Sequence, residues 1–418
     1  MRGRLCLTAA FVLSGVLAGP AVARGAPVDW YGRVLEPGVT KSRLDVGGLH
    51  TRMLQAGPPD AREAIVFVHG NPGSSLDWVH LVSVAGQTGR AVAIDMPGFG
   101  QSDKRDNFPY SVDGEADFLQ RALTKLGIDR VHLVLHDFGG PFGLQWATRH
   151  PDALKSVVLL DTGVFLNYYG HPLAFVWHTP VIGEAQANTT TRETFTAEVQ
   201  SGNPRLLPAD FVNRMYDEYD AATRRAALKL YRSISNPDAM GRAQAAVLRR
   251  RQRPALVIWG ASDQYIPAYV AYEQDQAFPG AQVHLLDSGH WPFVDNVDKV
   301  DALALPFWRR VVPRFSPALR KLRFSLQRVH AARAQRYSSL RLRVCSVDGK
   351  PVTGVRARLY RRRAGRLRLA GSSGRSRNVT RCGRLSVRLK QRLRHGARYR
   401  LVVSGDGVVA ANRVLRVR

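Results

Sequence analysis

The sequence predicts an α/β protein with a mostly parallel central sheet and an inserted helical cap, followed by a small all-β domain. Three observations predict this organisation. Short apolar runs alternate with helix-like segments, a long helical and aromatic stretch separates two of these runs, and the positive charge is concentrated at the C-terminal end. Alternating strands and helices are typical of βαβ units and a parallel sheet.

Length and composition set the outer limits. The chain has 418 residues, of which 45% are hydrophobic and 22% are charged. That length fits about two domains of roughly 100–200 residues each, and the composition excludes wholesale disorder. The three cysteines are too few for a disulfide-dense scaffold or a four-cysteine metal site.

Residues 1–23 have the pattern of a secretory signal peptide. Arg2 and Arg4 precede the apolar run Leu5–Ala18, and Ala21-Val22-Ala23 forms an A-x-A cleavage motif. The run is shorter than the ~20 residues of a spanning helix, so an uncleaved membrane anchor is the alternative. We expect cleavage after Ala23 and a secreted or extracytoplasmic location, which includes association with the cell envelope.

The strands of the first domain, residues 24–308, are expected at short apolar runs rich in Val, Ile and Leu. These runs are 65–68, 91–94, 131–135, 157–160, 255–259 and 283–286. Continuous apolar strands indicate a sheet that is buried on both faces. Helices are expected between them, for example over 112–126 and 142–149. The cap is expected at about 163–252, and ordinary surface helices are the alternative for that stretch.

One strand leads into a candidate nucleophile. The run 131–135 continues as His136-Asp137-Phe138-Gly139-Gly140, which has the layout of a nucleophile elbow, a tight turn between a strand and a helix. An aspartate at its centre can attack an sp³ carbon and form an alkyl ester. The N-terminus of the following helix favours the ionised carboxylate. The alternative is that Asp137 only caps this helix.

Two further strands end in an acid and a base. Asp263 follows the run 255–259, and His290 follows 283–286. In this hypothesis His290 removes a proton from water, while Asp263 holds the imidazole in the required tautomer. Asp161, after the run 157–160, is a rival for the role of the acid.

A fourth strand leads into a candidate oxyanion site. His69-Gly70-Asn71-Pro72-Gly73 follows the run 65–68. The backbone N–H groups of Asn71 and Phe138 would then stabilise the oxyanion that develops during ester hydrolysis.

With these motifs, residues from about 45 to 308 resemble the aspartate-nucleophile branch of the α/β-hydrolase superfamily, which includes epoxide hydrolases and haloalkane dehalogenases. His136 to Gly139, His69 to Pro72 and the pair Asp263 and His290 carry the resemblance. It implies a small apolar electrophile as the substrate and a reaction that needs no cofactor or metal.

The resemblance implies different leaving-group sites for the two activities. Epoxide hydrolases open the ring with two cap tyrosines, and Leu230-Tyr231-Arg232 resembles the motif around one of them. The second tyrosine is not clear; Tyr168 and Tyr169 lie in the first cap segment, but Leu173 or Phe175 can hold the matching place.

Haloalkane dehalogenases bind the halide with an Asn, which Asn71 matches, and a Trp, which Phe138 replaces; phenylalanine has no N–H to donate. We therefore expect an epoxide hydrolase-like enzyme, with haloalkane dehalogenase-like activity as the alternative. Another type of hydrolase, or an inactive fold that binds an envelope polyanion, are further alternatives.

The C-terminal part is strongly basic. Residues 309–418 hold 32 Lys and Arg but only two acids, Asp348 and Asp406. Residues 309–339 read as a linker. Residues 340–418 alternate apolar and basic positions over 340–345, 355–360, 384–389 and 399–403, the signature of half-buried strands. They predict a small β-sandwich-like domain, with a weak resemblance to immunoglobulin-type modules.

The basic domain also holds the two cysteines of the mature chain, because Cys6 leaves with the signal peptide. Export favours a disulfide between Cys345 and Cys382. A basic face can bind an anionic envelope polymer or a lipid surface through residues 309–418, and export makes nucleic acid an unfavourable partner. A solvated charged surface with no partner is the alternative. The sequence gives no oligomeric state.

Overall fold

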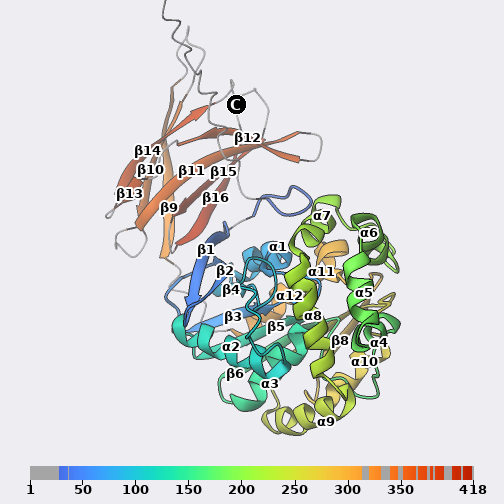
Figure 1. Ribbon diagram of the computed structural model, residues 1–418. Helices are drawn as coiled ribbons and strands as arrows, with labels where there is room; N and C mark the ends of the chain where they lie inside the picture. Colours follow the sequence, from blue (N-terminus) through green and yellow to red (C-terminus); the bar gives the residue numbers. More distant parts are fainter. Residues whose placement is uncertain are drawn as a thin grey trace, which may run out of the picture.

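The computed structural model describes two bodies of secondary structure (Figure 1). The described residues are 28–35, 37–312, 320–330, 339–346, 352–363, 366–373, 377–379, 382–389, 398–405 and 408–416. The expected signal peptide, residues 1–23, and its cleavage site lie outside them. In the described part of the chain, no helix combines the length and the apolar character needed to cross a membrane.

The first body is built on an eight-stranded sheet with the order β1-β2-β4-β3-β5-β6-β7-β8. Its strands are β1 (Thr40–Val46), β2 (Leu49–Ala56), β3 (Glu63–Val68), β4 (Arg90–Ile94), β5 (Arg130–His136), β6 (Leu154–Leu160), β7 (Ala255–Gly260) and β8 (Gln282–Leu286). Strands β3 to β8 run parallel, and β2 is antiparallel to both neighbours. Each of the six apolar runs lies in one of the strands β3 to β8, so the predicted α/β fold is confirmed.

The hairpin β1–β2 was not anticipated from the sequence. Its strands are amphipathic, and its turn is Gly47-Gly48, where both residues have positive φ. Such a turn favours glycine because other residues are strained there. The hairpin buries Arg52, whose guanidinium group pairs with Asp95 at 2.9 Å and Glu218 at 2.7 Å.

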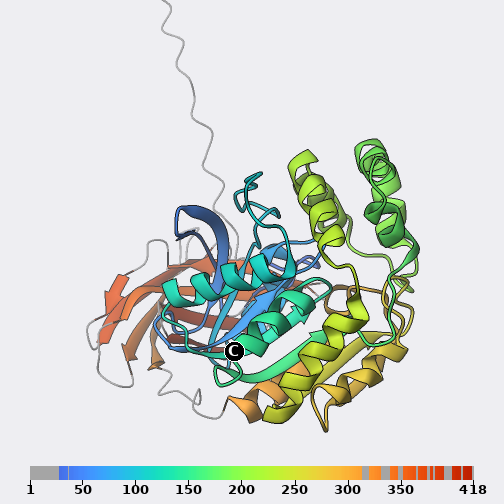
Figure 2. The ribbon, with the colours of Figure 1, turned by 60° about the horizontal axis from the view of Figure 1, so that its bottom comes forward.

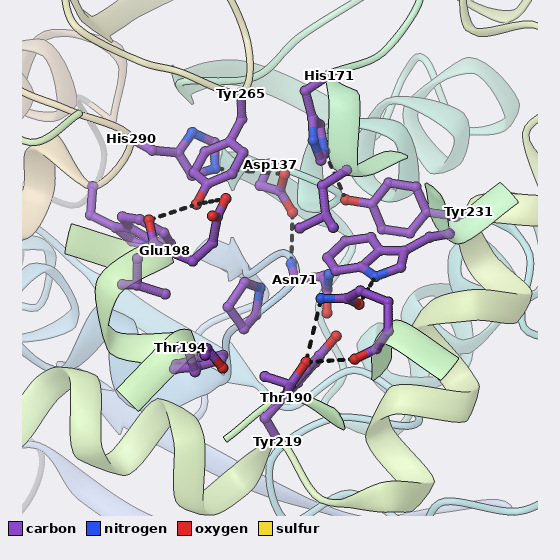
Figure 3. A pocket seen from close by; sticks show the side chains of 17 residues that line it. Asn71, Asp137, His171, Thr190, Thr194, Glu198, Tyr219, Tyr231, Tyr265 and His290 are labelled. Carbon is purple, nitrogen blue, oxygen red and sulfur yellow. Dashed lines mark hydrogen bonds and ion pairs between the residues drawn. The ribbon is translucent and has the colours of Figure 1, made fainter. Parts of the chain in front are cut away.

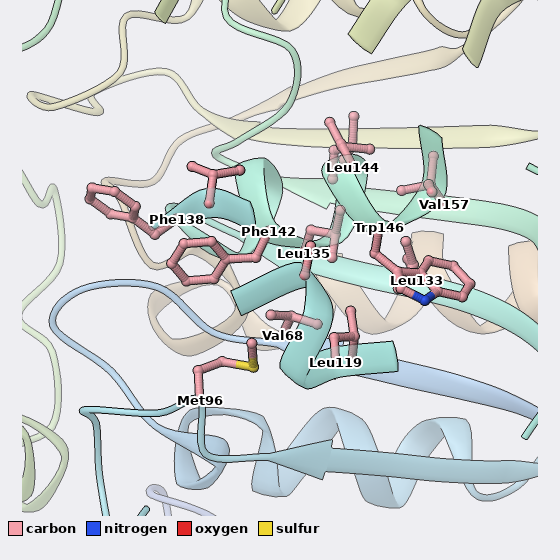
Figure 4. Close-up of a cluster of buried hydrophobic side chains, with 14 of the residues drawn as sticks. Val68, Met96, Leu119, Leu133, Leu135, Phe138, Phe142, Leu144, Trp146 and Val157 are labelled. Atoms are coloured by element: carbon pink, nitrogen blue, oxygen red, sulfur yellow. The ribbon is translucent and has the colours of Figure 1, made fainter. Parts of the chain in front are cut away.

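Helices cover both faces of the sheet because its strands alternate between two cores. In β3, Val66 and Val68 face one core, while Ile65 and Phe67 face the other. The first core is closed by α2 (Val112–Lys125) and α3 (Gly139–Arg149), as Figure 4 shows. The second is closed by α1 (Val79–Ala85) and α12 (Val297–Val311). Short segments complete the body: η1 (Ser75–Trp78), α10 (Tyr269–Glu273), η3 (Gln274–Gln276) and α11 (Pro292–Asp295).

The stretch between β6 and β7 forms a helical cap. Its helices are α4 (Pro172–His178), α5 (Ile182–Thr189), α6 (Arg192–Gln200), α7 (Ala209–Glu218), α8 (Ala221–Ser233) and α9 (Pro237–Leu248), followed by η2 (Arg249–Arg251). Local caps define several of their ends: the Asp220 carboxylate accepts from Thr223 N–H at the start of α8, and Asn236 does so from Ala239 N–H at the start of α9. Figure 2 shows that several of these helices stand beyond one end of the sheet.

The second body is the predicted all-β domain, and it forms one curled sheet. Its strands are β9 (Arg320–His330), β10 (Ser339–Ser346), β11 (Val352–Arg363), β12 (Arg366–Ser372), β13 (Arg377–Val379), β14 (Cys382–Leu389), β15 (Arg398–Gly405) and β16 (Val408–Arg416). The order is β12-β14-β10-β9-β16-β15-β11-β13, and β12 also pairs with β11, so the sheet curls back on itself. Inward positions such as Leu342, Leu359 and Leu401 form its core.

The segment 309–339, expected to be a linker, differs from that expectation. It carries the end of α12 at Val311 and the strand β9, which pairs with β10. Leu322, Phe324 and Leu326 give β9 the same two-residue alternation as its neighbours, and the surrounding arginines obscure it in the sequence. The expected disulfide between Cys345 and Cys382 is present, and the two residues are paired across β10 and β14.

Candidate active site

Asp137 lies on a sharp turn between β5 and α3. Its φ of 49° is in the left-handed region, an uncommon conformation for a residue other than glycine. The turn needs glycine nearby, because a Cβ at Gly139 would lie 2.1 Å from the carbonyl oxygen of Val68. A Cβ at Gly70 would lie 2.2 Å from Oδ1 of Asp137. The backbone thus holds the Asp137 carboxylate against the loop after β3.

Asp137, His290 and Asp263 lie together at the carboxyl ends of their strands. Nε2 of His290 is 3.6 Å from Oδ2 of Asp137, and Nδ1 donates to Oδ2 of Asp263 at 2.8 Å. The other oxygen of Asp263 accepts from the N–H groups of Tyr265 at 2.8 Å and Ile266 at 3.1 Å. This arrangement leaves Nε2 of His290 directed towards the nucleophile, where a water molecule can be activated.

The two carboxylates around His290 favour its charged form. Burial would lower the pKa of His290, but the charges of Asp263 and Asp137 raise it to about 10. Burial likewise raises the pKa of Asp137, but the hydrogen bond and charge of His290 lower it below its ordinary value. The site therefore rests as a carboxylate beside an imidazolium. An ester on Asp137 would remove this charge, which would make His290 a better base.

His136 supports this arrangement as a neutral group. Burial and the charge of His290 lower the pKa of His136 to about 3. Its Nε2–H donates to the carbonyl oxygen of His290 at 2.7 Å, which fixes the loop that carries the base.

Asp161 lies beside the acid but does not contact the base in the way Asp263 does. Its Oδ1 accepts from Gly260 N–H at 2.7 Å, and its carboxyl group is buried against Asp263. Burial and the neighbouring charge of Asp263 raise the pKa of Asp161 well above its usual range. The carboxyl group of Asp161 thus favours its protonated form, and the contact with Nδ1 of His290 at 2.8 Å belongs to Asp263.

Asp161, Asp263 and His290 also form the one group of His, Cys, Asp and Glu side chains in the described residues whose donor atoms, within 4.8 Å of one another, could hold a metal ion. Two of these three donors already bind each other. This geometry suits an acid–base relay better than a metal site.

Asn71 reaches the nucleophile with its backbone. Its N–H donates to Oδ1 of Asp137 at 2.6 Å, and its peptide bond to Pro72 is cis. The side-chain amide of Asn71 is buried beside the hydroxyl groups of Tyr219 and Tyr231. Phe138, the other predicted member of this site, places its ring edge-to-face with Tyr231, 4.8 Å between centroids.

Two cap side chains face Asp137, and the sequence predicted one of them. Tyr231 of α8 lies beside His171, whose Nε2 is 3.2 Å from the Tyr231 hydroxyl (Figure 3). Burial and the charge of Asp137 raise the pKa of Tyr231, and burial lowers that of His171 to about 4. Both are thus neutral hydrogen-bond donors at neutral pH.

His171 was not predicted, because the resemblance to epoxide hydrolases implies a second tyrosine at this place. Of the four candidates, Tyr168 donates instead to the carbonyl of Tyr265 at 3.0 Å, Tyr169 and Phe175 are exposed, and Leu173 is apolar. The sequence feature that could have indicated His171 is its place directly before the helix that starts with Pro172.

Two cavities meet at the nucleophile. The first, here called the polar cavity because of its hydrogen-bonding groups, measures about 180 Å³. Its lining combines the polar side chains Asn71, Gln186, Thr190, Thr194, Glu198, Tyr219 and His290 with the apolar side chains Leu173, Trp177, Phe195, Val199 and Trp291. The second, the aromatic cavity, measures about 240 Å³, and its lining includes Phe138, Phe165, Tyr168, Tyr169, Phe175 and Ile234. Asp137, His171 and Tyr231 line both cavities.

The second body presents a row of exposed arginines, here called the arginine face. It consists of Arg341 and Arg343 on β10 and Arg384 and Arg388 on β14. Arg343 lies directly opposite Arg384 in the register of the two strands. None of the four pairs with a carboxylate of the described residues, so their mutual repulsion is uncompensated there.

Comparison with known proteins places the first body in a family. A family profile with the description alpha/beta hydrolase fold matches residues 63–297. A cis-3-alkyl-4-alkyloxetan-2-one decarboxylase of Xanthomonas campestris is 29% identical over 278 residues, covering 62% of this chain and 92% of the relative. A haloalkane dehalogenase of Mycolicibacterium smegmatis is 42% identical, but over 104 residues, which are 24% of this chain and 33% of the relative.

Solved structures show the same fold. The epoxide hydrolase CorEH matches with a TM-score of 0.56 and 17% identity, over 65% of this chain and 99% of that chain. The haloalkane dehalogenase DatA of Agrobacterium tumefaciens matches with a TM-score of 0.57 and 21% identity, over 68% of this chain and all of that chain. At these identities the likeness concerns the fold alone.

Proposed function

Because the chain belongs to the α/β-hydrolase fold family, we propose that it is a hydrolase that opens epoxides through an ester on Asp137. The observation that carries this proposal is that the Tyr231–His171 pair lines the same cavities as Asp137. Opening an epoxide needs a proton donor for the ring oxygen opposite the attacking carboxylate. A neutral tyrosine beside a neutral histidine provides that donor.

The reaction proceeds in two steps. An oxygen of Asp137 attacks a ring carbon, the carbon–oxygen bond breaks, and the ring oxygen takes the proton of Tyr231, while His171 hydrogen-bonds to the phenol oxygen. The imidazolium proton of His290 then returns to the Tyr231 oxygen through water in the cavity. Neutral His290 removes a proton from a water molecule, which adds to the ester carbonyl of Asp137.

The second step ends with the release of a diol. The tetrahedral intermediate carries an oxyanion that Asn71 N–H stabilises, since this donor already lies 2.6 Å from Oδ1 of Asp137. The intermediate collapses to the Asp137 carboxylic acid, and the departing alkoxide takes the proton that His290 received from water. The carboxylic acid then passes its own proton to His290, which restores the carboxylate and the imidazolium. Asp263 stabilises the imidazolium through its contact with Nδ1 at 2.8 Å.

Single-turnover hydrolysis in ¹⁸O-water with mass spectrometry tests this proposal. The label should enter the peptide that contains Asp137 and be absent from the first diol released. The variant His290→Phe should accumulate an alkyl adduct on that peptide with aryl epoxides, and Asp137→Asn in the same background should not. An adduct on another residue, or ¹⁸O in the first diol only, would refute the role of Asp137.

Dehalogenation is the second candidate. The buried side-chain amide of Asn71 lines the same cavity as Asp137, so its N–H can donate to a departing halide. Against this, Phe138 offers no second N–H. Bromoalkanes in the same trapping experiment separate the two activities. The relative from Xanthomonas acts on an oxetan-2-one, another strained oxygen ring, so oxetan-2-ones belong in the same panel.

We also propose that the protein acts outside the cytoplasm. The pattern of residues 1–23 supports this, and the disulfide Cys345–Cys382 is compatible with an oxidising compartment. N-terminal sequencing of protein from the extracytoplasmic fraction should begin at Arg24. Full-length protein in the cytoplasmic fraction alone would contradict the proposal.

The arginine face is proposed to bind a linear anionic polymer of the envelope. Exposed guanidinium groups on neighbouring strands match a chain of phosphates or carboxylates. Among the residues of this sheet whose exposure is described, no large apolar side chain is exposed, so a hydrated polymer is a better fit than an inserted lipid surface.

Retention on immobilised long-chain polyphosphate tests this, with phosphatidylglycerol vesicles as the lipid comparison. Replacing the four arginines of the arginine face by glutamine should weaken retention at least about tenfold at moderate salt. The matched control is four Arg→Gln changes on the hydrolase body, at Arg62, Arg105, Arg192 and Arg242. Equal losses in both variants would mean that only net charge matters, and preferential binding to vesicles would favour a lipid partner.

A further inference from the structure

The nucleophile lies at the junction of two unlike cavities rather than at the end of one. The polar cavity and the aromatic cavity share Asp137, His171 and Tyr231. A substrate whose electrophilic carbon reaches Asp137 therefore has free space on two sides. Its ring oxygen points to Tyr231, and each remaining substituent enters one of the cavities.

The aromatic cavity suits an apolar substituent. Phe138, Phe165 and Ile234 form its walls. Tyr169 and Phe175, which also line it, are 72% and 57% exposed, so its mouth at the protein surface is aromatic. An alkyl or aryl group that enters here exchanges water for aromatic and aliphatic contacts, which is favourable in proportion to its apolar area.

The polar cavity also has apolar walls, but it differs from the aromatic cavity by a group of hydrogen-bonding side chains and one carboxylate. Its lining includes Thr190, between α5 and α6, and Thr194 and Glu198 of α6 (Figure 3). The Glu198 carboxylate accepts from the Tyr265 hydroxyl at 3.3 Å and is exposed at the mouth. No Lys or Arg is part of the lining of either cavity. Together with Asp137, Glu198 makes this cavity unfavourable for an anion.

We propose that the substrate is an internal epoxide with two unlike substituents, an apolar group for the aromatic cavity and a neutral or cationic hydrogen-bonding group for the polar cavity. This rests on the proposed ring-opening function. Glu198 is the residue that selects the second substituent, because its carboxylate attracts a hydroxyl or ammonium group and repels a carboxylate. A terminal epoxide leaves one cavity filled only with water.

Four epoxides that share one phenylalkyl substituent test the proposal. The second ring carbon carries hydrogen, or a short chain that ends in a hydroxyl, an ammonium or a carboxylate group. With the wild-type enzyme, kcat/KM should be highest for the ammonium and hydroxyl compounds. The ammonium compound should exceed the carboxylate compound about tenfold, the size expected for one partly exposed charge acting with opposite sign on the two.

The variants separate the two cavities. Glu198→Gln should bring the ratio of ammonium to carboxylate kcat/KM close to one, whereas Glu193→Gln, the same charge change on the outside of α6, should not. Thr194→Trp should lower the ratio of hydroxyl to terminal epoxide by filling the polar cavity. Ala174→Phe, which narrows the aromatic cavity, should cost about fourfold in kcat/KM for each methylene of the apolar group that loses its place.

The outcomes also distinguish the inference from the function on which it rests. If the epoxides are hydrolysed through an Asp137 adduct but all four have equal kcat/KM, the two-substituent inference is wrong and the function stands. If Glu193→Gln lowers the charge ratio as much as Glu198→Gln, the assignment of Glu198 is wrong. If no ring gives turnover or an adduct in His290→Phe, both are overturned.

Discussion

Replacing Asp263 and Asp161 one at a time shows which of these two neighbouring acids orients His290. Asp263 contacts Nδ1 of His290 at 2.8 Å, whereas Asp161 contacts the N–H of Gly260. Asp263→Asn removes the carboxylate and lets the amide favour the wrong imidazole tautomer. Asp161→Asn replaces a buried carboxyl group, whose pKa is raised, by an amide of nearly the same shape, which still accepts from Gly260.

The structure sets the size of the two effects. The pKa of His290 is raised to about 10 from an ordinary value of 6.5, which corresponds to ~5 kcal/mol of preference for the imidazolium. Both Asp263 and Asp137 contribute to this raised pKa. After Asp137 has become an ester, Asp263 alone stabilises the imidazolium, so its loss should slow ester hydrolysis about 10³–10⁴-fold. Asp161→Asn should slow it less than about tenfold.

The assay is rapid-quench measurement of the alkyl-enzyme in single turnovers. Asp263→Asn should accumulate the Asp137 adduct because its hydrolysis is slowed, while Asp161→Asn should accumulate little. A second readout is stability. The pKa of Asp161 is raised in the fold, so its burial costs stability above the unfolded pKa of about 4, and Asp161→Asn should stabilise the protein at pH 7 more than at pH 4. Near-full activity in Asp263→Asn, or a severe loss in Asp161→Asn, would refute this reasoning.

Three further predictions follow from single contacts. Tyr231→Phe should slow epoxide opening about 10²-fold. It should slow bromoalkane displacement far less, because bromide leaves without a proton. Single-turnover rates measure both effects, and equal losses for the two substrates would contradict this role of Tyr231. His80 lies 3.0 Å from Asp29 and 2.8 Å from Asp301, and its pKa is raised to about 9. This contributes ~3 kcal/mol that is present below pH 6.5 and lost as the pH rises through 9, so His80→Gln should destabilise strongly at pH 6 and little at pH 10 in urea unfolding. Gly139→Ala should lower the Tm sharply or prevent folding, because its Cβ would lie 2.1 Å from a carbonyl oxygen of β3; an unchanged Tm would refute the close packing of the elbow.

The sequence predicted the parts of the fold that depend on burial alone. Strands β3 to β8 read as apolar runs because helices cover both of their faces. The hairpin β1–β2 was missed because it lies at the edge of the sheet and alternates polar with apolar residues. Its buried Arg52 is intelligible only once Asp95 and Glu218, far apart in the chain, are seen beside it.

The candidate site, like the fold, could be predicted from the sequence only in part. Asp137, Asp263 and His290 were expected to lie together because each follows a strand, and parallel strands bring their carboxyl ends to one edge of the sheet. No comparable rule predicts which cap residues face the site, because the packing of the cap helices depends on side-chain contacts between segments that are distant in the sequence. Tyr231 was named from a local resemblance, but its neighbour His171 depends on how α4 packs on α8. The selecting role proposed for Glu198 likewise depends on where α6 lies.

In the mechanism proposed above, the charges of the site make the two steps follow one another. In the resting state the carboxylate of Asp137 and the imidazolium of His290 stabilise each other, so the nucleophile is ionised and the base is switched off. Attack on the substrate consumes the charge of Asp137. The imidazolium then keeps Asp263 as its remaining carboxylate partner, and it gives up a proton more readily. Formation of the ester is thus the event that activates the base, and water that enters before the ester exists meets no base to deprotonate it.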